Sequence, residues 1–206
     1  GLSTAMQLAS RGASVTLLER ERLGNGSTGR AAGLLGQLRG TPAATRMLMD
    51  GVEIVADLEE RAGVEIFVQT GSLRVAETDE RAGEIRDLGR SIGFDIDHLP
   101  IDEVAPLLPY MRTDDLLDAC YCPSDGHLQP AELVAAYLQV GRERGVVYTT
   151  GCPVRGLEFS GDRVSGVVTD EGTISTGVVI NAAGPWSYLV AGLADSTLQT
   201  SALGHV

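Results

Sequence analysis

The first 21 residues, GLSTAMQLASRGASVTLLERE, have the order of the second half of a dinucleotide-binding fingerprint. In the complete motif, a strand delivers G-x-G-x-x-G to a helix N-terminus, and an acidic residue follows about 20 residues later. Gly1 fits the last glycine, residues 2–11 predict a helix ended by Gly12, and residues 13–19 predict a buried strand ending in Glu19. A carboxylate at that place can accept ribose hydroxyls. We therefore expect a dinucleotide site and a fragment that lacks the first strand, although any amphipathic helix followed by a strand gives the same pattern.

The charge balance narrows the range of partners. The sequence has 28 acidic and 16 basic residues, a net charge of -12, and every basic residue is arginine. This balance argues against nucleic acid or an anionic membrane as a partner. An anionic cofactor would have to be held by local backbone N–H groups. No apolar run reaches the length of a membrane span, and no lysine is present to act as a base or to form a Schiff base.

The cysteines favour a reducing compartment over a disulfide framework. Cys120, Cys122 and Cys152 are the only three, so the cytoplasm is the expected location. Cys120 and Cys122 alternate in a predicted strand, where both thiols share one face as small apolar groups. A metal site with His127 lacks a fourth ligand at suitable spacing, so no metal is expected.

Helix and turn signals are strongest in the middle of the chain. Thr41-Pro42 supplies an N-cap and a first-turn proline, and Gly63 supplies a stop, so residues 42–62 predict a long helix. Residues 66–68 and 72–76, joined through Thr70-Gly71, predict a hairpin. The other expected elements are helices over 79–92, 101–109 and 130–144 and strands over 118–122 and 146–149.

Two segments look suited to lie against a ligand. Residues 24–33 are rich in glycine, hydroxyls and small side chains, which is typical of backbone pressed against a bound group. Residues 154–159, 163–169 and 173–180 predict a three-stranded antiparallel meander, because good turn signals separate them. Its last strand is apolar on both faces and ends in the small residues 181–184, NAAG, where backbone can approach a ligand.

Four segments together resemble one superfamily in their order and spacing. They are residues 1–22, 24–33 and 154–187 and the helix that follows 125–130. The superfamily contains the FAD-dependent oxidoreductases related to D-amino-acid oxidase, glycine oxidase, sarcosine oxidase and dimethylglycine dehydrogenase. The resemblance implies an α/β fold: a Rossmann-like FAD-binding domain with an antiparallel β-meander, plus part of an α+β substrate domain. The implied FAD-binding segments are 1–70, without its N-terminal strand, and 125–190, and the implied substrate-domain segments are 71–124 and 191–206.

The resemblance also implies how FAD is held. Gly1 would lie under the pyrophosphate at the helix N-terminus, and Glu19 would bind ribose. Ser27 and Thr28 would hydrogen-bond phosphate oxygens, and the backbone at Val154 would pair with adenine. The full set of implied FAD-binding residues is Gly1, Glu19, Arg20, Ser27, Thr28, Gly29, Arg30, Ala32, Gly33, Val154, Ala182, Ala183 and Gly184.

Arg30 and His205 are the two candidate catalytic residues. Dimethylglycine dehydrogenase-like members carry, at the position of Arg30, a histidine that bonds covalently to the flavin. Arginine cannot form that bond, so non-covalent FAD is expected. Arg30 could instead stabilise negative charge on the reduced ring or pair with a substrate carboxylate, and a solvated or phosphate-paired arginine is the alternative. His205 would lie near the substrate, or have no role there.

The implied reaction is hydride transfer from the carbon next to an amine to flavin, giving an imine that water hydrolyses. The implied substrate is a small amine or N-methylated amino acid such as glycine, sarcosine or dimethylglycine, with dioxygen or an electron carrier as acceptor. A 2-hydroxy-acid or glycerol-phosphate dehydrogenase and a non-catalytic FAD-binding subunit are the alternatives. A homo-oligomer or a subunit of a larger complex is expected, and these 206 residues made alone are expected to bind FAD poorly.

Overall fold

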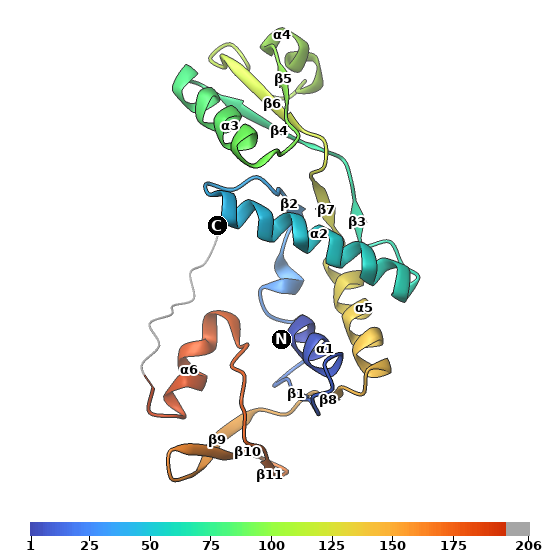
Figure 1. Cartoon of the computed structure of the whole chain (residues 1–206), viewed down its shortest axis with the longest axis vertical. Helices are drawn as coiled ribbons and strands as arrows, with labels where there is room; N and C mark the ends of the chain where they lie inside the picture. The colour runs from blue at the N-terminus through green and yellow to red at the C-terminus, as the bar shows by residue number, and fades with distance from the viewer. Residues whose placement is uncertain (197–206) are drawn as a thin grey trace. The chain divides into compact units, whose positions relative to one another are not determined.

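The computed structural model describes residues 1–196 and divides into two compact units (Figure 1). Unit 1 comprises residues 1–31 and 134 onward, and unit 2 comprises residues 32–133. Unit 1 contains α1 (Leu2–Ala9), β1 (Thr16–Leu18), η1 (Thr28–Arg30), β8 (Val147–Thr149), β9 (Val154–Ser160), β10 (Arg163–Thr169), β11 (Gly172–Ser175), η3 (Gly184–Trp186) and α6 (Ser187–Gly192). Unit 2 contains β2 (Leu34–Leu35), α2 (Pro42–Ala62), β3 (Phe67–Val68), β4 (Ser72–Ala76), α3 (Asp79–Ile92), β5 (Asp97–Leu99), α4 (Ile101–Val104), η2 (Ala105–Leu107), β6 (Asp118–Cys122) and β7 (Gly126–Leu128). Helix α5 (Pro130–Glu143) begins in unit 2 and continues in unit 1.

Unit 1 is built on a parallel pair of strands. β1 and β8 pair in parallel, with Thr16 opposite Val147 and Leu18 opposite Thr149. Helix α1 precedes β1 and buries Ala5 and Met6. The predicted helix over residues 2–11 and the predicted strand over 13–19 are both present, but they are shorter than expected, and the strand residues Thr16–Leu18 are exposed or half-buried rather than buried. Together with the antiparallel sheets described below, they confirm the expected mixed α/β class.

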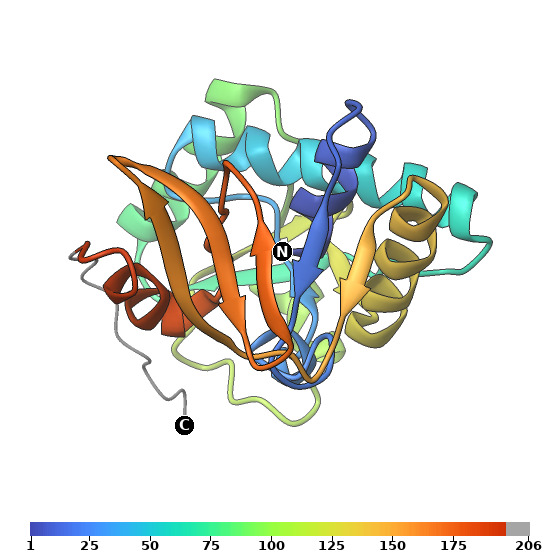
Figure 2. The same ribbon diagram turned by 90° about the horizontal axis from the view of Figure 1, so that it is seen from below.

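The predicted meander is confirmed for two strands and corrected for the third. β9, β10 and β11 form an antiparallel sheet in the order β11-β10-β9 (Figure 2). The third strand was expected to continue to residue 180, but β11 ends at Ser175. Val178 and Ile180 are instead 73% and 51% exposed. The apolar run forms no strand because no strand in the described part of the chain pairs with its backbone.

Unit 2 contains two antiparallel sheets, with the strand orders β2-β7-β3 and β4-β6-β5. The predicted hairpin over residues 66–76 is wrong, because β3 pairs with β7 while β4 pairs with β6. The turn at Gly71 donates its N–H to the carbonyl of Asp125 at 2.8 Å, so it anchors the chain to a distant loop. The two strands therefore belong to different sheets.

The helices of unit 2 end where their capping residues predict. Thr41 caps α2 by accepting the N–H of Ala44, Pro42 follows as the first helical residue, and Gly63 closes the helix at φ +69°. α3 lies along the sheet of β4, β6 and β5 (Figure 1). Between the helices and this sheet is a core of buried side chains. It comprises Leu38, Ile85, Phe94, Cys120 and Cys122.

The two strand cysteines behave as core residues. Cys120 and Cys122 are free and buried, and burial raises the pKa of both thiols, so they remain neutral. Among residues 1–196, no group of three or more possible metal ligands converges. No helix in the same range is long and apolar enough to cross a membrane.

Candidate functional site

In unit 1, the first turn of α1 presents backbone N–H groups that no side chain caps. Gly1 is the N-cap, it has no side chain to accept a hydrogen bond, and the first turn contains no acidic residue. The first N–H groups of a helix have no partner within the helix, and they attract anions. A β-carbon placed at Gly1 would lie 3.6 Å from the β-carbon of Ala182, so the structure brings these two predicted residues together.

Glu19 lies directly after β1, as predicted. Its N–H donates to the carbonyl of Thr149 and its carbonyl accepts the N–H of Cys152, each at 2.9 Å. The carboxylate Oε1 accepts the N–H of Glu21 at 2.9 Å, which fixes the side chain beside the strand end. The chain continues from Cys152 to Val154, the first residue of β9. The structure therefore places Val154 two residues after Cys152, whose backbone is hydrogen-bonded to Glu19.

Arg20 stacks on the single tryptophan. Its guanidinium carbon is 5.3 Å from the ring centroid of Trp186, and its Nε is 3.6 Å from Oε1 of Glu21. A β-carbon at Gly26 would lie 3.7 Å from the same ring. The sequence did not predict this cation–π contact, since Arg20 and Trp186 are far apart in the chain and neither has a local signal.

The loop that follows is held by its own backbone. The Gly29 N–H donates to the carbonyl of Gly24 at 2.8 Å, and a β-carbon at Gly29 would fall well inside 3.0 Å of that oxygen. The Nη1 of Arg30 donates to the carbonyls of Asn25 and Gly26, the latter at 2.9 Å. Arg30 thus holds the two ends of the loop together through these carbonyls. Its catalytic role stays a prediction. Ser27 and Thr28 are exposed.

Three further predicted positions, Ala182, Ala183 and Gly184, lie in the chain segment that follows β11. Asn181 orders it, because its Oδ1 accepts the N–H of Ala183 at 3.2 Å and its Nδ2 donates to the carbonyl of Ser187 at 2.8 Å. Gly184 has φ +56°. The small residues of the motif NAAG were predicted to lie near the ligand. The role of Asn181, the first residue of that motif, in ordering the segment was not predicted.

Ala32 and Gly33 belong to unit 2. Gly33 has φ +77°, and its carbonyl accepts the N–H of Leu128 at 2.7 Å. A β-carbon at Gly33 would collide with the carbonyl oxygen of Leu128. The requirement for glycine is therefore structural at this position. His205 lies outside the described residues.

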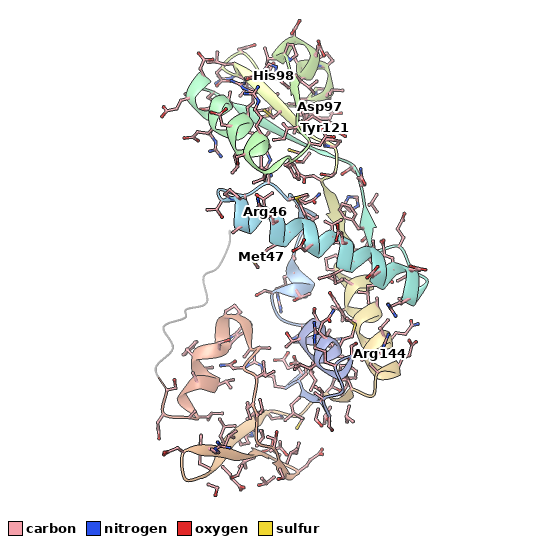
Figure 3. The ribbon with its side chains drawn as sticks, in the orientation of Figure 1. Arg46, Met47, Asp97, His98, Tyr121 and Arg144 are labelled. Atoms are coloured by element: carbon pink, nitrogen blue, oxygen red, sulfur yellow. The ribbon has the colours of Figure 1, made fainter. Side chains whose placement is uncertain are left out.

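A second polar cluster, in unit 2, surrounds Asp118. Its carboxylate pairs with both Arg86 and His98, and it accepts the N–H of Ala119 at 2.8 Å. His98 is the member of this cluster that Figure 3 labels. Burial opposes ionisation of this carboxyl, but the hydrogen bonds from His98, Ala119 and Arg86 outweigh it and hold the pKa of Asp118 below its usual value. No local sequence pattern indicates this cluster, because its members come from three separate elements, α3, β5 and β6.

This cluster makes the stability of unit 2 sensitive to acid. The pKa of Asp118 is lower in the folded than in the unfolded chain, so its contribution is present above the usual value of 3.8 and is lost as the pH falls below it. We expect Asp118→Asn to cost about 1–3 kcal/mol at neutral pH and to flatten this acid dependence. Hydrogen exchange of peptides from β4 and β6 between pH 3 and 7 measures both effects. An unchanged pH dependence in the variant would contradict the assignment.

The residues of unit 1 fit the chemistry of a dinucleotide. Uncapped N–H groups at α1 suit a pyrophosphate, and the oriented carboxylate of Glu19 suits ribose hydroxyls. Gly1 and Ala182 lie close together, and neither has a long side chain that would stand between a ligand and the backbone.

Comparison with known proteins agrees with this class of fold and site. The family profile described as "DAO: FAD dependent oxidoreductase" matches residues 1–205. The chain therefore belongs to the family of FAD-dependent oxidoreductases whose members include sarcosine and dimethylglycine dehydrogenases and glycine oxidases. The expected FAD-binding fold is confirmed by its structural neighbours.

Three similar proteins illustrate the family. Human mitochondrial sarcosine dehydrogenase is 35% identical over 216 residues, which cover 100% of this chain and 24% of that protein. The mouse mitochondrial pyruvate dehydrogenase phosphatase regulatory subunit is 28% identical over 193 residues, which cover 91% of this chain and 22% of that protein. The crystal structure of L-proline dehydrogenase from P. horikoshii superimposes with a TM-score of 0.87 at 27% identity, covering 94% of this chain and 52% of that one. The chain thus spans about a quarter of the length of sarcosine dehydrogenase and of the phosphatase regulatory subunit, and about half of the length of a similar glycine oxidase.

Proposed function

We propose that this chain is the FAD-binding part of an oxidoreductase that oxidises a small amine or an N-methylated amino acid, similar to glycine, sarcosine or dimethylglycine. The observation that carries the proposal is the family match over residues 1–205. It is supported in unit 1, where the N-terminus of α1 has free backbone donors and the end of β1 has a carboxylate acceptor, as a dinucleotide needs. Two similar proteins, named for sarcosine and L-proline, act by their names on amino acids with a secondary amine, which supports this substrate class.

Bound FAD would supply the acceptor for a hydride from the carbon next to the amine nitrogen. In unit 1, the first-turn N–H groups after Gly1 would hold the pyrophosphate, and Glu19 would accept the ribose hydroxyls. Ser27 and Thr28 would bind phosphate oxygens through their exposed hydroxyls. Arg30 would keep the loop closed through the carbonyls of Asn25 and Gly26.

The cofactor is proposed to be non-covalent. The side chain of Arg30 is occupied with loop carbonyls and has no atom that bonds to flavin carbon under ordinary conditions. Dioxygen or an electron carrier is the proposed acceptor, and the cytoplasm the proposed location. The proposed domain division is unchanged. Residues 1–70 and 125–190 would form the FAD-binding domain, and residues 71–124 and 191–206 would belong to the substrate domain.

The intact protein tests the proposal directly. We expect a flavin spectrum, release of the flavin into the supernatant on acid precipitation, and anaerobic bleaching by sarcosine, dimethylglycine or glycine. Bleaching by 2-hydroxyglutarate or glycerol phosphate alone would show a hydroxy-acid or glycerol-phosphate dehydrogenase instead. A protein that takes up no FAD would refute the proposal.

A non-catalytic FAD-binding subunit is the second candidate function. It is favoured by the similarity to a phosphatase regulatory subunit, which shows that a similar sequence occurs in a protein named for regulation. Bound flavin that no amine or hydroxy acid bleaches would support this candidate.

A further inference from the structure

Trp186 is held on both sides by the backbone of its own segment. Its N–H donates to the carbonyl of Ala183 at 3.1 Å, and the carbonyl of the next residue, Ser187, accepts a hydrogen bond from Nδ2 of Asn181 at 2.8 Å. The indole itself is half-buried. A rigid aromatic side chain on an ordered backbone loses little further freedom when it binds a second group, so it makes a suitable platform.

The face of this platform is in contact with Arg20, which comes from a distant part of the chain. Arg20 belongs to the segment 1–31 of unit 1, and Trp186 belongs to the segment that begins at residue 134. The guanidinium carbon lies 5.3 Å from the ring centroid, within the roughly 6 Å that a cation–π contact requires. Arg20 directly follows Glu19, whose carboxylate is oriented at the end of β1. The contact therefore fixes the direction of Arg20 beside the residue predicted to bind ribose.

Stacking leaves the hydrogen-bonding edge of Arg20 free. The N–H donors of a guanidinium lie in its plane, whereas a stacked ring contacts its face. Oε1 of Glu21 is 3.6 Å from Nε of Arg20, which is longer than a hydrogen bond, and the other carboxylate oxygen accepts the side-chain amide of Asn25. The Arg20 side chain is 54% exposed, so its donors are open to an incoming anion.

The segment that carries Trp186 also contacts the neighbouring parts of the candidate site. A β-carbon at Gly26 would lie 3.7 Å from Cζ3 of the indole, and a β-carbon at Gly1 would lie 3.6 Å from that of Ala182. Residues 181–187 thus contact the strand end, the loop after it and the N-terminus of α1. In a chain with a net charge of -12, a cation fixed at this place offsets the unfavourable overall field for a diphosphate.

We propose that Trp186 is a positioning residue for FAD, which holds Arg20 so that the guanidinium binds the diphosphate of the cofactor. Trp186 contributes to cofactor affinity through Arg20 rather than by touching the cofactor. Arg30 has a different task, because its Nη1 is bonded to loop carbonyls. The proposal rests on the FAD-binding part of the proposed function and is independent of its substrate class.

Titration of FAD into the apoprotein of the intact protein, followed by flavin fluorescence, measures this role. We expect Trp186→Leu to raise the Kd for FAD roughly 3- to 30-fold, the range for one lost cation–π contact. Arg20→Gln is expected to raise it roughly 10- to 150-fold, the range for one lost charged hydrogen bond. In the Arg20→Gln background, Trp186→Leu should change the Kd by less than about twofold. An equal effect of Trp186→Leu in both backgrounds would show a purely structural role and overturn the proposal.

Two further variants separate the chemistry of the ring from its bulk and from net charge. Trp186→Phe keeps an aromatic face and is expected to recover most of the affinity that Trp186→Leu loses, and equal Kd values for the two would contradict the proposal. Arg11→Gln is the matched control, since Arg11 is an exposed arginine of unit 1 whose Nη1 is bonded to Gln7. It should stay within about twofold of the unaltered protein. A loss as large as that of Arg20→Gln would show that net charge alone sets the affinity, against the proposal.

A measurement on the unaltered apoprotein needs no variant. Phenylglyoxal modifies accessible arginines, and peptide mass spectrometry reads the extent at each site. We expect ADP, which carries the diphosphate without the flavin, to protect Arg20 and to leave Arg11 unprotected. Equal modification of Arg20 with and without ADP would overturn the proposal even if Trp186→Leu fails to fold.

Turnover separates this proposal from the proposed function. If the variants of Arg20 and Trp186 weaken FAD binding as expected but no amine bleaches the bound flavin, the positioning role stands and the proposed substrate class fails. If sarcosine bleaches the flavin but Arg20→Gln binds FAD as tightly as the unaltered protein, the positioning role fails alone.

Discussion

Asp125→Ala is expected to destabilise unit 2 by about 3–5 kcal/mol, because it removes a fully buried charge and leaves its partners unpaired. The N–H of Gln37 and the hydroxyl of Ser72 would lose their acceptor, and Arg74 would lose the nearest negative charge. The methyl group of alanine cannot replace any of these interactions. Hydrogen exchange of the intact protein measures the effect, in peptides that cover β2 and β4.

The comparison with an exposed acid isolates the cause. Asp50 lies exposed on α2, so Asp50→Ala should change local stability by no more than about 0.5 kcal/mol. Asp125→Asn should fall between the two, since an amide oxygen still accepts one hydrogen bond but carries no charge. If Asp125→Ala exchanges no faster than Asp50→Ala, the buried carboxylate does not organise this part of unit 2.

The sequence predicted best what is encoded within a few neighbouring residues. The helix over 42–62 was predicted to the residue, because Thr41, Pro42 and Gly63 each act on the backbone beside them. The same holds for the helix over 79–92. Caps and apolar periodicity need no knowledge of distant partners.

Strand pairing was predicted less well, because its partners are distant in the sequence. Residues 66–68 and 72–76 look like a hairpin locally, yet β3 pairs with β7 and β4 pairs with β6. Similarly, Val178 and Ile180 have the composition of a buried strand but are exposed. A run of apolar residues shows that a segment can be buried, and only its neighbours decide whether it is.

The candidate FAD positions were predicted from motif order, whereas the contacts that hold them were not. The stacking of Arg20 on Trp186 and the closure of the loop by Arg30 depend on the folded backbone. Arg74 was also missed, although a single arginine inside the strand sequence SLRVA is an available signal. Its ion-pair partner, the buried Asp125, is 51 residues away in the sequence, so no local pattern shows the pairing.

Gly33→Ala is expected to destabilise unit 2 by about 2–4 kcal/mol, because two separate penalties act at one position. The backbone has φ +77°, a conformation that L-residues with a β-carbon rarely adopt. The added β-carbon would also collide with the carbonyl oxygen of Leu128. Relief of that collision requires the hydrogen bond from the Leu128 N–H to the Gly33 carbonyl, now 2.7 Å long, to stretch or break. Faster hydrogen exchange is expected at Leu128.

Gly40→Ala is the matched control, because a β-carbon at Gly40 would meet no atom within 4 Å and its φ is not in the left-handed region. We expect this variant to lie within about 0.5 kcal/mol of the unaltered protein. The contrast separates the general loss of backbone freedom in the unfolded chain, which both substitutions share, from the strain and collision that only Gly33 adds. If the two variants exchange alike at Leu128, then β2 and β7 tolerate a side chain at Gly33, and its place in the motif reflects the approach of a ligand rather than the packing of unit 2.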